Sequence, residues 1–184
     1  MLEAEHYYIE KAQAGDHTAF QKLYEHYVPK IYRFVYLKVS SKSEAEDLTH
    51  EVFLNVWQNL GRYTHQGFPF SSWVYQIARN EVIDFYRTKK KTVPLEDIDE
   101  NFLKTGEHLQ HELHQSLNLE KVRGLIPLLH TDQQDVLIMR FVEDLSHKEI
   151  AQTLNKSEGA VRLIQHRALN NLKKLIQKQY GSLI

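Results

Sequence analysis

The chain has 184 residues, and its 23 lysines and arginines against 24 aspartates and glutamates give a formal net charge of −1. A nearly neutral chain excludes a histone-like, uniformly basic nucleic-acid binder. The hydrophobic share of 42% and the charged share of 26% are those of one ordinary folded domain or two small ones, which excludes wholesale disorder.

The sequence shows no signal for export or for disulfide bonding. No apolar run approaches the roughly 18 to 20 residues that cross a bilayer. Residues 1–6 have neither the basic region nor the apolar stretch of a signal peptide. The absence of cysteine excludes disulfides, thiolate catalysis and cysteine-ligated metal sites. We therefore expect a cytoplasmic protein with no membrane insertion.

Helical periodicity runs through most of the chain, because apolar residues recur at spacings of three and four and only 7 glycines and 4 prolines interrupt them. The pattern predicts an all-α protein with two small helical domains, residues 1–91 and 119–184, joined by an acidic flexible linker over 92–118. Within 92–116 there are six acids and one lysine, a net charge of −5, with few large apolar residues. This composition is typical of a solvated tether.

An amphipathic helix is predicted over residues 43–60. Ser43 stands three residues before Glu46, which is the spacing of a capping box. The apolar stripe recurs every four residues, at Leu48, Val52, Val56 and Leu60. The other side carries acidic and polar residues, Asp47, His50, Glu51 and Asn55. That side is either a solvated face or a surface that docks on a basic partner.

A second helix is predicted from Ser71 or Ser72 to Arg87, after a loop that contains three aromatic residues. The aromatic residues of the loop are Tyr63, Phe68 and Phe70, and the segment 79–91 has a net charge of +3. Exposed rings near basic residues can stack on the bases of single-stranded nucleic acid. Alternatively, Phe70 and Trp73 belong to the core, and the lysine run is a solvated helix end.

A helix-turn-helix is predicted near the C-terminus. A short helix stops at Asn155, a three-residue turn follows, and Ser157 can cap a second helix that continues to about Lys178. The buried stripe of that helix is Val161, Ile164, Ala168, Leu172 and Leu175. The segment 156–178 has six bases and one acid, so its far face would suit a major groove. The alternative is an antiparallel helix pair with a solvated basic face.

Catalytic and metal-binding motifs are weak or missing. His108, His111 and His114 are spaced so that two of them could bind zinc on a helix, but they do not fit the metalloprotease spacing. No phosphate-binding glycine loop and no nucleophile elbow is present in the sequence. We expect no cofactor, no metal and no enzymatic activity.

Three segments, 45–57, 72–87 and 145–151, occur in an order that resembles bacterial sigma factors of the extracytoplasmic-function type. In that family the first helical block is region 2 and the second is region 4, with no region 3 domain between them. The resemblance covers nearly the whole chain. It implies a sigma factor that binds core RNA polymerase, recognises the −35 and −10 promoter elements and assists promoter melting.

The resemblance also implies three groups of site residues. Contact with the polymerase would involve Asp47, His50, Glu51, Phe53 and Asn55. Contact with the −10 element would involve Tyr63, Phe68, Phe70, Trp73, Gln76, Arg79, Asn80, Asp84, Arg87, Lys89 and Lys90. Contact with the −35 element would involve Ser157, Glu158, Gly159, Ala160, Arg162, Leu163, His166, Arg167, Asn170 and Lys173.

The implied partners are core RNA polymerase, through its clamp coiled coil and flap, promoter DNA, and an anti-sigma factor. The linker would thread toward the RNA exit path of the polymerase. An alternative function from a different class of protein remains. In it, the chain is a stand-alone helix-turn-helix transcriptional regulator with an N-terminal sensing or dimerisation domain. That reading predicts tight operator binding by the isolated chain and no association with polymerase.

Overall fold

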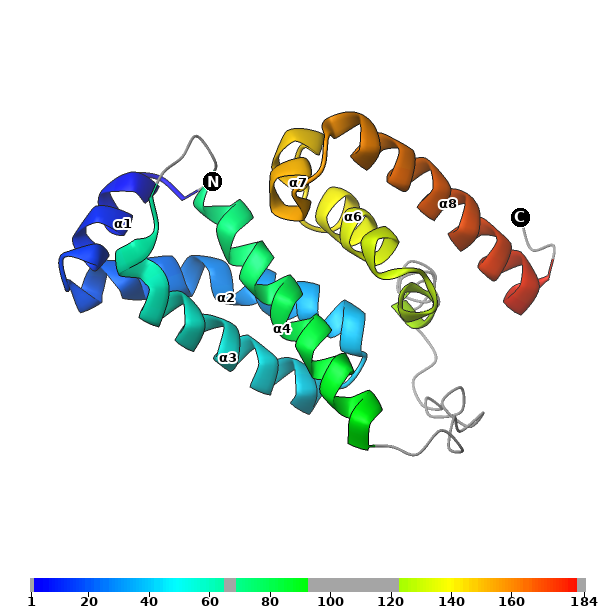
Figure 1. The fold of residues 1–184 in the computed structure, drawn as a ribbon, viewed down its shortest axis with the longest axis horizontal. Coiled ribbons are helices and arrows are strands. Elements are labelled where there is room, and N and C mark those ends of the chain that lie inside the picture. Colours follow the sequence, from blue (N-terminus) through cyan, green and yellow to red (C-terminus); the bar gives the residue numbers. More distant parts are fainter. Residues whose placement is uncertain (1, 65–68, 93–122, 182–184) are drawn as a thin grey trace, which may run out of the picture.

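The computed structural model describes residues 2–64, 69–92 and 123–181. The first stretch contains α1 (Glu5–Gln13), α2 (His17–Val39), α3 (Lys42–Asn59) and the short 3₁₀ helix η1 (Leu60–Arg62), and α4 (Phe70–Thr92) follows. The last stretch contains η3 (Ile126–Leu128), α6 (Thr131–Phe141), α7 (His147–Leu154) and α8 (Glu158–Tyr180) (Figure 1). Within these ranges no strand occurs, so the all-α prediction is confirmed. None of the helices described is long and apolar enough to cross a membrane.

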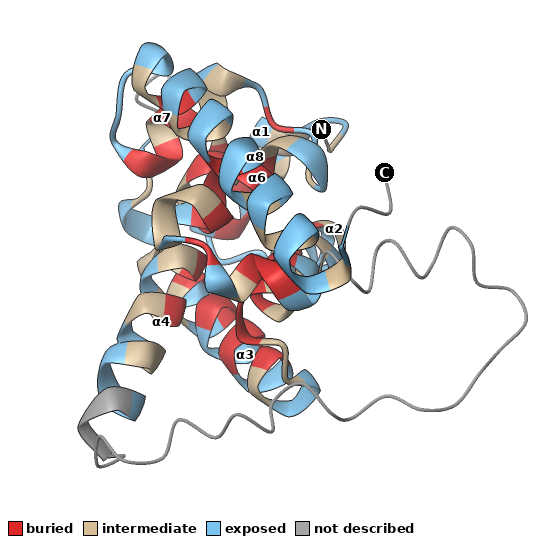
Figure 2. Ribbon diagram, turned by 90° about the vertical axis from the view of Figure 1, so that its right-hand side faces the viewer, coloured by how far each residue is buried: buried red, intermediate tan, exposed pale blue. Residues whose placement is uncertain are grey.

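Helices α1 to α4 form the first unit, whose core lies between α2, α3 and α4 (Figure 2). Phe34 and Val35 of α2, Val52 of α3 and Val74 of α4 are fully buried there. The apolar residues repeat at helical spacing along each helix, so each helix presents one buried face to the others. Asp16 starts α2, since its side chain accepts hydrogen bonds from the backbone amides of Thr18 and Ala19.

The start of α3 differs from the prediction. Ser41 caps the helix and accepts a hydrogen bond from the Glu44 amide, whereas Ser43 already lies inside the helix. Both serines stand three residues before a glutamate, so the spacing alone did not distinguish them. Ser40 closes α2 with a left-handed φ of 60°, which allows α3 to begin directly after it. The next helix, α4, likewise begins slightly earlier than expected, at Phe70.

The second unit contains the predicted helix-turn-helix, formed by α7 and α8. Asn155 ends α7 in the left-handed conformation, with φ 51° and ψ 51°. Ser157 caps α8 through the amide of Ala160. Val161 and Ala168 are fully buried, while Ile164, Leu172 and Leu175 are half-buried. Turn residues, cap and buried stripe therefore agree with the prediction for this motif.

Ser146→Ala is expected to destabilise the chain by about 1 kcal/mol. Ser146 forms a complete capping box with Glu149, in which each side chain bonds the backbone amide of the other residue. Alanine removes the acceptor for the Glu149 amide. Urea denaturation followed by circular dichroism measures the loss. Ser146→Asp, which retains a capping oxygen, should stay close to the wild type, and an alanine variant as stable as the aspartate variant would contradict the expectation.

The two units pack against each other. Helix α4 contacts α7, and α2 contacts α6 and η3, so that buried residues of both units form one continuous apolar cluster. Figure 1 shows α6 to α8 lying along one side of the α2–α4 group. The predicted linker lies outside the described residues except for Thr92, and so does the histidine cluster. The boundaries proposed for the two domains remain predictions.

Candidate nucleic-acid and polymerase interfaces

The acidic side of α3 is open to solvent. Asp47, His50 and Glu51 are all exposed, as a docking surface requires. Two apolar residues of the same helix that were not assigned to this surface, Leu54 and Trp57, are 39% and 37% exposed. The Trp57 ring is supported by stacking on His17, with the ring centroids 5.3 Å apart. The face therefore combines negative charge with apolar area.

Two residues assigned to this surface are partly or largely covered in this structure. Phe53 is only 5% exposed and packs edge-to-face on the Tyr24 ring, and its contact with a partner remains a prediction. Apolar side chains at this helical position belong to the core stripe. Asn55 is half-buried and donates a hydrogen bond to Glu81 of α4 at 3.2 Å. It ties α3 to α4 in this arrangement.

Aromatic rings gather where η1 meets α4. The Tyr63 ring lies 5.2 Å from the Phe70 ring and 5.0 Å from the Trp73 ring, measured between centroids. Gln13 of α1 fixes this segment by donating to the carbonyl oxygens of Leu60 and Tyr63 at 2.9 and 2.7 Å. Burial raises the pKa of the Tyr63 hydroxyl, so it remains a neutral donor.

Phe70 is 2% exposed, as expected for the alternative in which it belongs to the core, and in this arrangement its ring offers no face to a base. Its ring packs against the rings of Tyr27 and Tyr63, so Phe70 supports the Tyr63 ring from the core side. Tyr63 and Trp73 remain half-buried and keep part of their surface accessible. Phe68 lies outside the described residues.

The polar side of α4 follows the predicted helical spacing. Gln76, Asn80, Asp84 and Arg87 are all exposed. Arg87 pairs with Asp84 at 3.1 Å, and Lys89 pairs with Glu44 of α3 at 2.8 Å. Exposed pairs of this kind contribute little stability and exchange readily for phosphate partners. Nothing is described of the Lys90 side chain.

Arg79 does not lie on that exposed face of α4. Its position in this structure therefore differs from the accessible one that contact with the −10 element would need. Its guanidinium donates to Asp135 at 2.8 Å and to Asp132 at 2.9 Å, both on α6. Partial burial disfavours the charge, but the two carboxylates outweigh that effect and raise the pKa of Arg79. Arg79 therefore faces the second unit.

The recognition side of α8 is exposed over its first half. Arg162 and Leu163 point away from the core, and Arg162 pairs with Glu158 of its own helix, at 3.0 Å. The other predicted contact residues that are exposed are Gly159, His166, Arg167, Asn170 and Lys173. Ala160 is half-buried, and the Ser157 hydroxyl is engaged in capping α8. This face carries positive charge and an apolar contact, as duplex reading requires.

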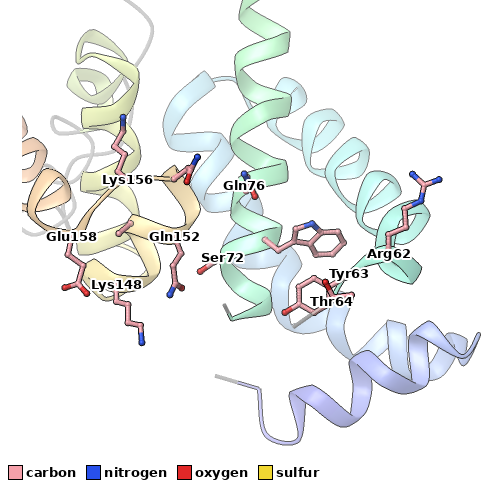
Figure 3. A pocket seen from close by; sticks show the side chains of 12 residues that line it. Arg62, Tyr63, Thr64, Ser72, Gln76, Lys148, Gln152, Lys156 and Glu158 are labelled. Carbon is pink, nitrogen blue, oxygen red and sulfur yellow. The ribbon is translucent and has the colours of Figure 1, made fainter. Parts of the chain in front are cut away.

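A cleft of about 600 Å³ separates the aromatic segment from the helix-turn-helix (Figure 3). Ser72 and Gln76 line its α4 side, and Lys148 and Gln152 line its α7 side. Arg62 and Lys156 add positive charge to its walls. Among the residues that the structure describes, no group of three or more histidines and acids could hold a metal ion.

Two helical units, one with an aromatic and polar surface and one with a basic helix-turn-helix, define a two-domain DNA-binding protein. The sigma-70 region 2 model matches residues 23–92, and the sigma-70 region 4 model matches residues 125–174. The chain therefore belongs to the sigma-70 family, in its extracytoplasmic-function (ECF) group. We refer to the first unit as region 2 and to the second as region 4.

Relatives of this group resemble the chain over most of its length. It is 35% identical to the ECF RNA polymerase sigma factor BldN of Streptomyces coelicolor, over 91% of this chain and 64% of BldN. It is 31% identical to the ECF sigma factor SigD of Mycobacterium tuberculosis, over 90% of this chain and 80% of SigD. The sigma factor RpoE of Bartonella quintana, solved in complex with the anti-sigma factor NepR, shares the fold with a TM-score of 0.68 and 22% identity, over 87% and 98% of the two chains.

Proposed function

We propose that this chain binds core RNA polymerase through region 2 and directs it to promoters, with α8 reading the −35 element and α4 with its preceding loop reading the −10 element. The observation that carries the proposal is the pair of exposed polar faces, one on each unit, that coincide with the two matched family regions. Neither face has the constellation of a catalytic site.

Reading of the −35 element would use the major groove. Arg162 can leave its exposed partner Glu158 and pair with a guanine edge, while Leu163 can contact a thymine methyl group. Arg167 and Lys173 are exposed further along α8 and suit phosphates, which fix the position of the helix on the duplex. The helix-turn-helix holds these side chains on one rigid element.

Reading of the −10 element would act on a melted strand. Tyr63 and Trp73 offer ring faces beside a polar cleft, and base stacking on such rings contributes roughly 1 to 3 kcal/mol per base. Gln76, Asn80 and Asp84 add hydrogen-bonding groups along α4, and Arg87 adds a cation at its end. Capture of an unstacked base would favour the open form of the duplex, since the duplex form hides that base.

The docking partner of α3 would be a basic surface, which we assign to the clamp coiled coil of the polymerase, with region 4 on the flap. Asp47 and Glu51 supply the charge, and Trp57 with Leu54 supplies apolar area for a buried anchor. We further infer a cytoplasmic location, where the polymerase acts. An anti-sigma factor is inferred by analogy with the RpoE complex.

Glu51→Lys is expected to weaken binding to a purified bacterial core RNA polymerase at least tenfold, because it places a cation against a basic partner. Co-elution on gel filtration and a fluorescence titration measure the loss. The matched control is Glu25→Lys, a charge reversal at another exposed glutamate, on α2. Absence of binding by the wild-type chain would contradict the proposal and favour the stand-alone regulator, as would equal losses in the two variants.

A further inference from the structure

Region 4 presents acidic residues to basic residues of region 2, the reverse of the charge that it presents on α8. Two region 4 carboxylates, Asp135 and Glu143, have almost no exposed side-chain surface. Every side-chain partner of these carboxylates in the described part of the chain belongs to region 2. Asp135 and Glu143 therefore link the two units, and they bond no side chain within the described part of region 4.

The first link centres on Asp135. One of its oxygens accepts a hydrogen bond from the Lys38 ammonium of α2, and the other accepts from Arg79 Nε of α4 at 2.8 Å. Lys38 is 1% exposed, and burial lowers the pKa of its ammonium while the charge of Asp135 opposes that shift. Asp132 extends the network to Arg79 and Lys156, at 2.9 and 3.2 Å.

The second link centres on Glu143, just after α6. Arg33 of α2 donates two parallel hydrogen bonds to the Glu143 carboxylate, from Nε at 2.6 Å and from a terminal nitrogen at 2.8 Å. The Tyr75 hydroxyl of α4 donates a third bond at 3.0 Å. A bidentate arginine pair of this kind is strong and geometrically specific.

If regions 2 and 4 were permanently packed together, the interface between them would not require buried ion pairs. Apolar residues of similar volume often replace a buried ion pair with equal or greater stability. Charged residues such as Lys38 and Asp135 instead remain compatible with water when the units separate, so the interface resembles one that forms and breaks.

Contact between the two regions is incompatible with simultaneous recognition of the −35 and −10 elements. Arg79, Tyr75 and Ser72 form a stripe on α4 that faces region 4, and Ser72 Oγ donates to the Glu149 carbonyl of α7 at 3.3 Å. The −35 and −10 elements lie about 25 base pairs apart by their positions, roughly 85 Å at 3.4 Å per pair. Two units in contact cannot reach both, whereas Asp47 and Glu51 on α3 stay open for polymerase.

We propose that the acidic surface of region 4, Asp132, Asp135 and Glu143, is an autoinhibitory latch that binds basic residues of α2 and α4 and covers the stripe on α4 until the two regions separate. The proposal rests on the function proposed above, which makes α4 a DNA-reading helix. The connecting segment 93–122 has thirty residues, enough by covalent length to span up to roughly 100 Å. Separation therefore needs no break in either unit.

The test measures the distance between the regions in the full chain. Because the chain has no cysteine, Gln21→Cys on α2 and Gln177→Cys on α8, both exposed, accept one spin label each for pulsed electron–electron distance measurement. The wild-type latch should give one narrow short-distance population. Asp135→Asn, and separately Glu143→Gln, should move most of that population to longer, broader distances. Helical content by circular dichroism confirms that each variant is folded. A shift to longer distances in either variant would support the latch.

The matched control is Asp144→Asn, which neutralises a region 4 carboxylate whose side chain is 99% exposed and should leave the distance unchanged. Unchanged distances in both latch variants, or an already broad wild-type distribution, would overturn the latch. Opening should also raise the affinity for core RNA polymerase at least about tenfold, because a closed chain can dock only through α3, whereas an open chain can dock through α3 and region 4 together. Opening without polymerase binding by any form would instead overturn the proposed function, and with it the inhibitory role, while the interdomain links would stand.

Discussion

Arg162→Ala is expected to reduce transcription from the promoters that this chain uses by about 10- to 100-fold, and to leave polymerase binding unchanged. A bidentate arginine–guanine pair discriminates by about 1 to 3 kcal/mol, or roughly 5- to 160-fold, and the expected loss lies within that range. Arg162 is exposed and pairs with Glu158 of its own helix at 3.0 Å, so its loss leaves the core of region 4 intact. Run-off transcription with the reconstituted holoenzyme measures the effect.

The control for Arg162 is Gln177→Ala, an exposed change on the same helix far from the turn. It should leave transcription within about twofold of the wild type. Promoter selectivity supplies a second readout, since loss of a base contact relaxes the sequence preference at one position. An Arg162 variant that loses polymerase affinity in proportion to its transcription would contradict the division of work between the two regions.

Phe34→Ala is expected to lower the free energy of unfolding by about 3 to 5 kcal/mol. Phe34 is fully buried in the centre of region 2, and its ring packs edge-to-face on Tyr75 with the centroids 5.5 Å apart. Alanine would leave a cavity beside α4, the helix to which we assign the −10 contacts. Urea denaturation measures the change, and polymerase binding should fall with the folded fraction.

Phe141→Ala provides the comparison, because this phenylalanine at the end of α6 is 58% exposed. Its loss should cost less than about 1 kcal/mol, as for most surface changes. Similar losses in the two variants would show that the core of region 2 is not centred on Phe34.

Local rules were sufficient where structure depends on neighbours in sequence. The helix-turn-helix was predictable because a left-handed turn residue, a capping serine and a buried stripe all occur within about thirty residues. Asn155, Ser157 and Val161 occupy the positions that these rules give them. The exposed side of α4 was predictable for the same reason, as Gln76 and Asn80 show.

Prediction failed where two local readings were equally good or where packing decided. Ser41 and Ser43 have the same spacing to a glutamate, and the end of α2 selects Ser41. Phe53 and Phe70 were assigned to binding surfaces, but large apolar rings at the edge of a core are buried when neighbours can cover them. The assignments of site residues to polymerase and DNA remain predictions.

The contacts between the two regions were missed entirely, although the sequence carried a signal. Lys38 follows Ile31 by seven residues and Phe34 by four, which places a charged residue in the core stripe of α2. Asp135 stands next to the apolar run 136–139 in the same way. A buried charge predicts a partner of opposite sign, but the two residues are 97 positions apart, and only the packing of the units pairs them.

Above all, we propose that this chain gives promoter selectivity to RNA polymerase. The most direct measurement is run-off transcription on DNA of the genome that encodes the chain, with core polymerase alone and with core polymerase plus the chain. We expect transcripts from a defined set of start sites that share −35 and −10 sequences and appear only when the chain is added. Identical transcripts in the two reactions, together with tight duplex binding by the chain alone, would contradict it.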